Sequence, residues 1–122
     1  MKNYTELDVW IKSRELVSII YEASKKFPEK ENYGLTLQMR KAVISVPSNI
    51  AEGCGRNHTK ETIQFLYISR GSLFELETQI YLAFDQQYLS QENLNLILDK
   101  ITECKKLVNG FINYFEQLKT IN

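Results

Sequence analysis

The sequence is short of the residue types on which most recognisable chemistry depends. Its 122 residues contain one His and two Cys, and 15 Lys and Arg balance 15 Asp and Glu, so the formal net charge is zero. One His and two Cys are too few for a structural zinc site or a disulfide scaffold. A neutral chain also lacks the global field that draws most nucleic-acid and anionic-membrane binders to their partners.

Proline, glycine and long apolar runs are scarce as well. Two Pro and five Gly argue against disorder, a collagen helix and a turn-rich all-β fold. No apolar run approaches the roughly 20 residues that a membrane-spanning helix needs. The polar start of the chain, with Glu6 and Asp8, does not have the pattern of a signal peptide. We therefore expect a soluble, cytoplasmic protein without a membrane partner, in which Cys54 and Cys104 are free thiols.

Helical periodicity runs along almost the whole chain, whereas strand alternation is not found over a useful length. Apolar residues recur at spacings of three, four and seven, which predicts helices over about residues 5–26, 32–52, 59–86 and 90–119. The breaks between them are only a few residues long, and short loops between long helices force neighbours to be antiparallel. The sequence predicts an all-α fold, an antiparallel up-down-up-down four-helix bundle, in one domain over residues 1–122.

Local signals indicate where these helices begin and end. Pro28 keeps the residue before it out of the helical conformation and should stop the first helix. Gly53 and Gly55 should end the second helix by adopting the left-handed conformation at its C-terminus. Thr59 and Ser90 are expected to cap the third and fourth helices.

The second and third helices carry more apolar surface than a lone bundle needs. The surplus consists of rows at seven-residue spacing: Leu37, Ile44 and Ala51 in the second helix, and Tyr67, Phe74, Tyr81 and Tyr88 in the third. A wide core-facing wedge would absorb part of this surface. The alternative is that the second rows meet other subunits, because exposed apolar patches of this size usually mark interfaces. We expect a homo-oligomer.

Polar side chains form a stripe along each of the same two helices. The stripes comprise Gln38, Ser45, Asn49 and Glu52 in the second helix and Ser72, Glu75 and Gln79 in the third. They predict a hydrogen-bonded network that fixes helix register or subunit contacts, with Arg40, Arg56 and Arg70 as available counter-ions. The functional alternative is a site with a carboxylate as general base. No nucleophile, metal set or histidine accompanies the carboxylates, so we predict no catalytic residue, no metal or cofactor and no small-molecule substrate.

Two stretches of the sequence are distinctive. The first contains Phe27-Pro28, Tyr33-Gly34-Leu35, residues 38–42, residues 45–53 and Arg56, and the second contains residues 65–72 and 75–79. Together they resemble the four-helix-bundle family known from open reading frames in 23S ribosomal RNA intervening sequences. The resemblance implies a bundle that assembles into a barrel-like homopentamer and has no established enzymatic activity. The accessory variability determinant of diversity-generating retroelements, which binds nucleic acid, is similar in fold.

A glycine-rich turn with local positive charge joins the second and third helices. Gly53-Cys54-Gly55-Arg56 is followed by His58 and Lys60, without the lysine and Ser/Thr spacing of a phosphate-binding loop. As a helix end and turn it needs no ligand. In a cyclic oligomer, however, Arg56, His58 and Lys60 would recur around the ring and form a positive collar. The preferred interpretation is a non-enzymatic homo-oligomeric scaffold or protein-interaction module, and the alternative is an accessory protein that binds RNA or DNA.

Overall fold

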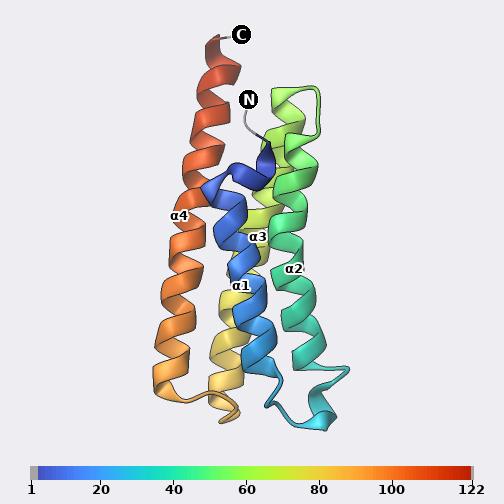
Figure 1. Ribbon diagram of the computed structural model, residues 1–122, viewed down its shortest axis with the longest axis vertical. Coiled ribbons are helices and arrows are strands. Elements are labelled where there is room, and N and C mark those ends of the chain that lie inside the picture. The colour runs from blue at the N-terminus through green and yellow to red at the C-terminus, as the bar shows by residue number, and fades with distance from the viewer. Residues whose placement is uncertain (1–2, 122) are drawn as a thin grey trace.

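The computed structural model describes residues 3–121, and this part of the chain contains helices and no strands. The elements are the 3-10 turn η1 (Tyr4–Glu6), α1 (Asp8–Ser24), the 3-10 turn η2 (Glu29–Glu31), α2 (Leu35–Cys54), α3 (Thr59–Asp85) and α4 (Gln91–Ile121). The four α-helices lie side by side, and each runs opposite to the one before it (Figure 1). The predicted all-α, up-down-up-down four-helix bundle is confirmed, and assembly into a ring stays a prediction.

Each helix packs against two neighbours around one core. α2 contacts α1 and α3, and α4 contacts α3 and α1. The apolar side chains that recur at helical spacing meet in the middle and are almost fully buried; the largest are Leu16, Ile20, Met39, Ile50, Leu66, Leu73, Leu76, Ile80, Ile97 and Ile101. Burying each such side chain contributes about 1.5–3 kcal/mol to folding, so the core is the main source of the bundle's stability.

Short 3-10 turns shift the first two helices from their predicted bounds. α1 begins at Asp8 rather than near residue 5, because η1 forms a separate turn and Leu7 is extended. It ends at Ser24, before Phe27-Pro28. α2 begins at Leu35 rather than near residue 32, because residues 29–31 form η2. Helical periodicity alone does not separate such turns from the helices that they adjoin.

Three local predictions about helix ends have different outcomes. Gly55 has φ −83° and is right-handed, so the predicted left-handed glycine at the end of α2 is wrong. Among the described residues, the positive φ angle is that of Gln87, at 68°. Thr59 is not a cap, because it is the first residue of α3 and follows the N-cap His58. The Ser90 cap is confirmed, since its Oγ accepts a hydrogen bond from the backbone N–H of Asn93 at 3.1 Å.

The start of α2 is capped by a side chain from η2. The carboxylate of Glu31 accepts hydrogen bonds from the backbone N–H of Leu35 at 3.0 Å and from the hydroxyl of Tyr88 at 2.8 Å. These two bonds lower the pKa of Glu31, with the Leu35 bond as the larger cause. The hydrogen bond to Glu31 is the largest cause that raises the pKa of Tyr88. The contact ties the α1–α2 connection to the segment between α3 and α4.

Small residues allow α2 and α3 to approach closely. The Ser69 hydroxyl donates to the Val46 carbonyl and the Thr62 hydroxyl to the Gly53 carbonyl, each at 2.8 Å. A Cβ at Gly53 would lie 3.1 Å from both the Thr62 carbonyl oxygen and the Cβ of Phe65. Glycine at this position is therefore explained by the neighbouring helix, and the pair forms a rigid support for the side chains that project from it.

Candidate functional site

Three residues of the predicted polar stripes form one cluster across the α2–α3 contact. The hydroxyls of Ser45 and Ser72 are 2.8 Å apart. The Nδ2 of Asn49 donates to the Ser45 hydroxyl at 2.9 Å and to the Ser45 carbonyl at 2.8 Å. All three side chains are partly buried. The cluster satisfies polar groups between two helices and fixes their register.

The other stripe residues are not joined to this cluster. Glu52 pairs with Arg56 at 2.9 Å in an exposed ion pair. The Nε2 of Gln79 donates to the Glu75 carboxylate at 3.3 Å, and the buried Oε1 of Gln79 has no partner in the described part of the chain. Gln38 is exposed. The stripes therefore divide into separate groups rather than one continuous network.

The expected counter-ions are mostly used elsewhere. Arg40 lies over the ring of Tyr21 at 4.5 Å and donates to Ser24 at 3.0 Å, and Arg70 contacts α4 through Asn109. Glu77 is paired with Lys105 of α4 at 2.8 Å. The pairing of Glu77 with Lys105 could not be predicted from the sequence, because the two residues are on different helices and no local spacing relates them.

The predicted second apolar rows remain on the surface of the single chain. In α2, Leu37 and Ile44 are 39% and 41% exposed. In α3, Tyr67, Phe74 and Tyr81 are 44%, 52% and 49% exposed. Large apolar side chains that are exposed together in this way are typical of surfaces that bind another molecule.

One member of the aromatic row was assigned wrongly. α3 ends at Asp85, so Tyr88 lies beyond it and does not continue the exposed row. Its ring packs against Phe27 with the centroids 5.2 Å apart, and its hydroxyl is bound to Glu31. Seven-residue spacing alone cannot show that the helix has already ended.

Two further apolar residues belong to the exposed side of α3. Ile68 is 51% and Leu82 is 47% exposed, and each lies seven residues from the exposed Glu75. We call the surface formed by Tyr67, Ile68, Phe74, Tyr81 and Leu82, with Gly71 and Glu75 among them, the outer face of α3. Ile68 and Leu82 were not among the predicted apolar rows, although seven-residue spacing places both on the same side of the helix as Glu75.

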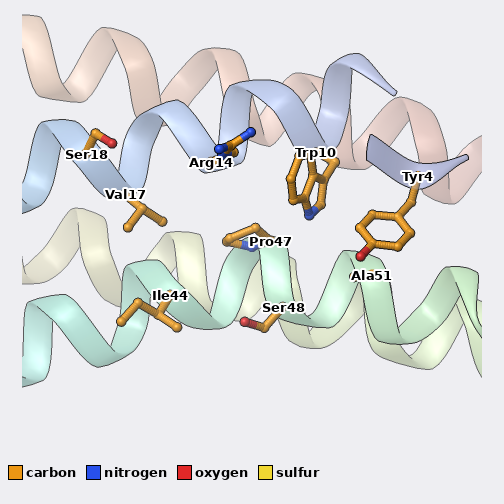
Figure 2. A pocket seen from close by; sticks show the side chains of 9 residues that line it. All are labelled: Tyr4, Trp10, Arg14, Val17, Ser18, Ile44, Pro47, Ser48 and Ala51. Carbon is orange, nitrogen blue, oxygen red and sulfur yellow. The ribbon is translucent and has the colours of Figure 1, made fainter. Parts of the chain in front are cut away.

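A groove runs between α1 and α2 on another side of the bundle. Figure 2 shows Trp10 and Val17 pointing from α1 toward Ile44 and Pro47 of α2. The remaining residues that line it are Tyr4, Arg14, Ser18, Ser48 and Ala51. Its volume is about 480 Å³, and the edge of the Tyr4 ring meets Trp10 with the centroids 5.4 Å apart. We call this feature the α1–α2 groove.

The basic loop residues lie at one end of the bundle, between α2 and α3. Arg56 is held by Glu52 and lies over the Phe65 ring at 4.6 Å. His58 and Lys60 are exposed. Arg56 is therefore engaged within its own chain, whereas the other two side chains point to solvent.

The described residues carry no grouping of three or more His, Cys, Asp or Glu placed to hold a metal ion. Both cysteines are free, as predicted. Burial raises the pKa of the Cys104 thiol to about 11 and also raises the pKa of Cys54. Within residues 3–121, none of the helices has the length and apolar character that crossing a membrane requires.

Comparisons with known proteins agree with the resemblance in the sequence. The profile of the 23S rRNA-intervening sequence protein family matches residues 5–110. A crystal structure of a protein of unknown function, from the S23 ribosomal protein family of Bacteroides thetaiotaomicron, is similar with a TM-score of 0.79 and 25% identity. The match covers 85% of this chain and 97% of that one. No curated protein is significantly similar to the chain. The chain belongs to the 23S rRNA-intervening sequence protein family.

Proposed function

We propose that the protein is a non-enzymatic homo-oligomeric scaffold or protein-interaction module, whose copies assemble into a barrel-like homopentamer. The observation that carries this proposal is that α3 is apolar on both sides. Its inner side contributes Leu66, Leu73 and Ile80 to the core, and its outer face exposes five more large apolar residues. A helix that is apolar all round is typical of one that is covered on all sides.

The energy available from the outer face supports assembly but does not suffice alone. Complete burial of one large apolar side chain contributes about 1.5–3 kcal/mol. Because the five side chains are about half exposed, covering them contributes roughly 4–7 kcal/mol for each copy. Association costs an estimated 4–15 kcal/mol or more. The outer face therefore needs a partner surface that also has apolar area to bury.

The polar clusters have a structural role in this proposal. Ser45, Asn49 and Ser72 join α2 to α3, and Ser69 ties α3 to the α2 backbone. These contacts hold α3 in one register, so its outer face is presented as a fixed surface. A preorganised surface loses less conformational entropy when it binds.

A second candidate function is RNA or DNA binding at the loop between α2 and α3. What favours it is that His58 and Lys60 are exposed at one end of the bundle, where a ring would bring several copies together. Binding of this kind is expected to weaken with salt and with a Lys60→Glu substitution. An RNA filter-binding assay at low and high salt measures both effects, and absence of binding at low salt excludes this candidate.

The proposed assembly is tested by the native mass of the purified chain. Size-exclusion chromatography with light scattering is expected to give a peak of about 72 kDa, five times the chain mass of 14.3 kDa. Absorbance at nucleic-acid and protein wavelengths, recorded together, shows whether nucleic acid elutes on the same peak. A protein-only peak supports the scaffold, and co-eluting nucleic acid favours the second candidate. A monomer at high concentration contradicts the proposal.

A further inference from the structure

We propose that the outer face of α3 in one copy seats in the α1–α2 groove of the next copy, with Glu75 of one copy beside Arg14 of the other. The inference rests on the proposed function, because it names the surface that buries the outer face. The occupant of the groove is thus a second copy of this chain. Apolar match, charge complementarity and an exposed glycine support the pairing independently.

The two surfaces match in their apolar character. Ile68 and Leu82 each lie seven residues from Glu75, which places them about 10 Å to either side of it along the helix. The α1–α2 groove offers Trp10, Val17 and Ile44 for contact. Packing the ridge of one helix into the groove between two others is the ordinary way in which helices associate.

The charges on the two surfaces are opposite. Glu75 is exposed and its contact within the chain is the amide of Gln79, whereas Arg14 contacts the ring of Trp10 at 5.4 Å. Among the ion pairs of the described residues, neither Glu75 nor Arg14 takes part in one. Lys41, three residues before Ile44 on α2, is also exposed. An acidic ridge and a basic groove favour each other as partners.

This charge pattern also favours the α1–α2 groove over the outer face of a second copy as the surface to which the outer face binds. The outward positions of α3, residues 67, 68, 71, 74, 75, 78, 81 and 82, include Glu75 and no Lys or Arg. The cations beside this face are already engaged within the chain. Lys105 of α4 is paired with Glu77 and lies over the Phe74 ring at 3.9 Å, and Arg70 lies over the Tyr67 ring at 5.0 Å and donates to Asn109. Two outer faces packed together would therefore bury Glu75 without an unengaged opposite charge, which is costly. Seating in the α1–α2 groove instead provides the guanidinium of Arg14.

Gly71 gives an observation of a different kind. It lies in the interior of α3, where glycine is about 1 kcal/mol less favourable than alanine. A Cβ at Gly71 would meet nothing within 4 Å in its own chain, and its φ is not positive. Nothing within the chain therefore requires glycine here, as is also true of Gly110 of α4. Gly71 differs from Gly110 in lying on the outer face of α3. Close approach of a second copy between Ile68 and Glu75 explains it.

The two surfaces lie on different sides of the bundle, so every copy can use both at once. A contact between two different surfaces is heterologous, and it gives a closed ring when the rotation between copies closes. The pairing of outer face and groove is therefore compatible with the proposed ring, whereas a contact of two identical surfaces gives a dimer.

Charge reversal at the proposed pair tests the inference. Arg14→Glu and Glu75→Arg are each expected to raise the dissociation constant about ten-fold or more, and the double variant is expected to restore assembly. The matched controls are Glu103→Arg and Lys106→Glu, which change exposed charges on α4. Light scattering over a range of concentrations gives the mass of each variant, and circular dichroism verifies that it is folded. If a reversal variant unfolds, Arg14→Gln and Glu75→Gln replace it.

The possible outcomes separate this inference from the proposed function. Loss of assembly in both single variants and recovery in the double variant supports the pairing. A wild-type oligomer that neither single variant weakens contradicts the pairing and leaves the scaffold proposal in place. A double variant no better than the single ones, or a dimer insensitive to Arg14→Glu, also overturns it. A monomeric wild type overturns both proposals.

Discussion

Replacing Ile68 with lysine perturbs the proposed interface while leaving the core of the bundle untouched. The side chain is 51% exposed on α3, and lysine is a good helix former, so the single chain is expected to keep its fold. In the assembly the change loses about 0.8–1.5 kcal/mol of apolar burial. It also places an ammonium in the apolar part of the proposed interface, and an uncompensated buried charge costs about 3–5 kcal/mol.

The sum of these effects predicts that Ile68→Lys raises the dissociation constant of each interface more than about 100-fold. Leu82→Lys is expected to act in the same way. Leu96→Lys is the matched control, because Leu96 is 52% exposed but lies on α4. Light scattering over a dilution series measures the effect, and circular dichroism verifies the helical content. Wild-type assembly by both α3 variants, with Leu96→Lys equally assembled, would refute the reasoning.

Three further predictions concern the single chain. The hydrogen bonds that Glu31 accepts lower the pKa of its carboxyl group. The stability that these bonds contribute is therefore present at neutral pH and is lost as the pH falls below the usual pKa of 4.5 toward the folded-state pKa. In urea unfolding, Glu31→Gln should be less stable than the wild type at pH 7 and should lose less stability toward pH about 3.5. Gly110→Ala should raise the free energy of unfolding by about 0.5–1 kcal/mol, because a Cβ there meets nothing within 4 Å; no gain in urea unfolding would contradict this. The buried thiol of Cys104, with its pKa of about 11, should react with a thiol reagent only after unfolding, whereas the half-buried Cys54 should react first. Equal reaction rates of the two thiols in the native protein would contradict the described burial.

The four helices could be predicted from the sequence because apolar periodicity reports burial directly. The start of α2 could not, because it depends on contacts between residues that are distant in the sequence. The carboxylate that caps Leu35 is positioned by Tyr88, which is 57 residues from Glu31. Gln87, with φ 68°, separates Tyr88 from α3, and no spacing rule registers that turn.

The candidate surfaces could also be predicted only in part from the sequence. The exposed rows that contain Ile44 and Phe74 follow from seven-residue spacing. The contribution of Ile68 and Leu82 was hidden because the aromatic row beside them dominates the pattern. The α1–α2 groove could not be predicted, since it depends on how Trp10 of α1 lies relative to Pro47 of α2 (Figure 2).

Hydroxyl-radical footprinting of the native protein tests most directly whether another copy covers the outer face of α3. Tyr67, Phe74 and Tyr81 are the probes, and Tyr114, which is 51% exposed on α4, is the internal reference. The account predicts that the probes are modified much more slowly than Tyr114 in the wild type and at similar rates in a dissociated variant such as Ile68→Lys. Modification of all three as fast as Tyr114 in the wild type would contradict it.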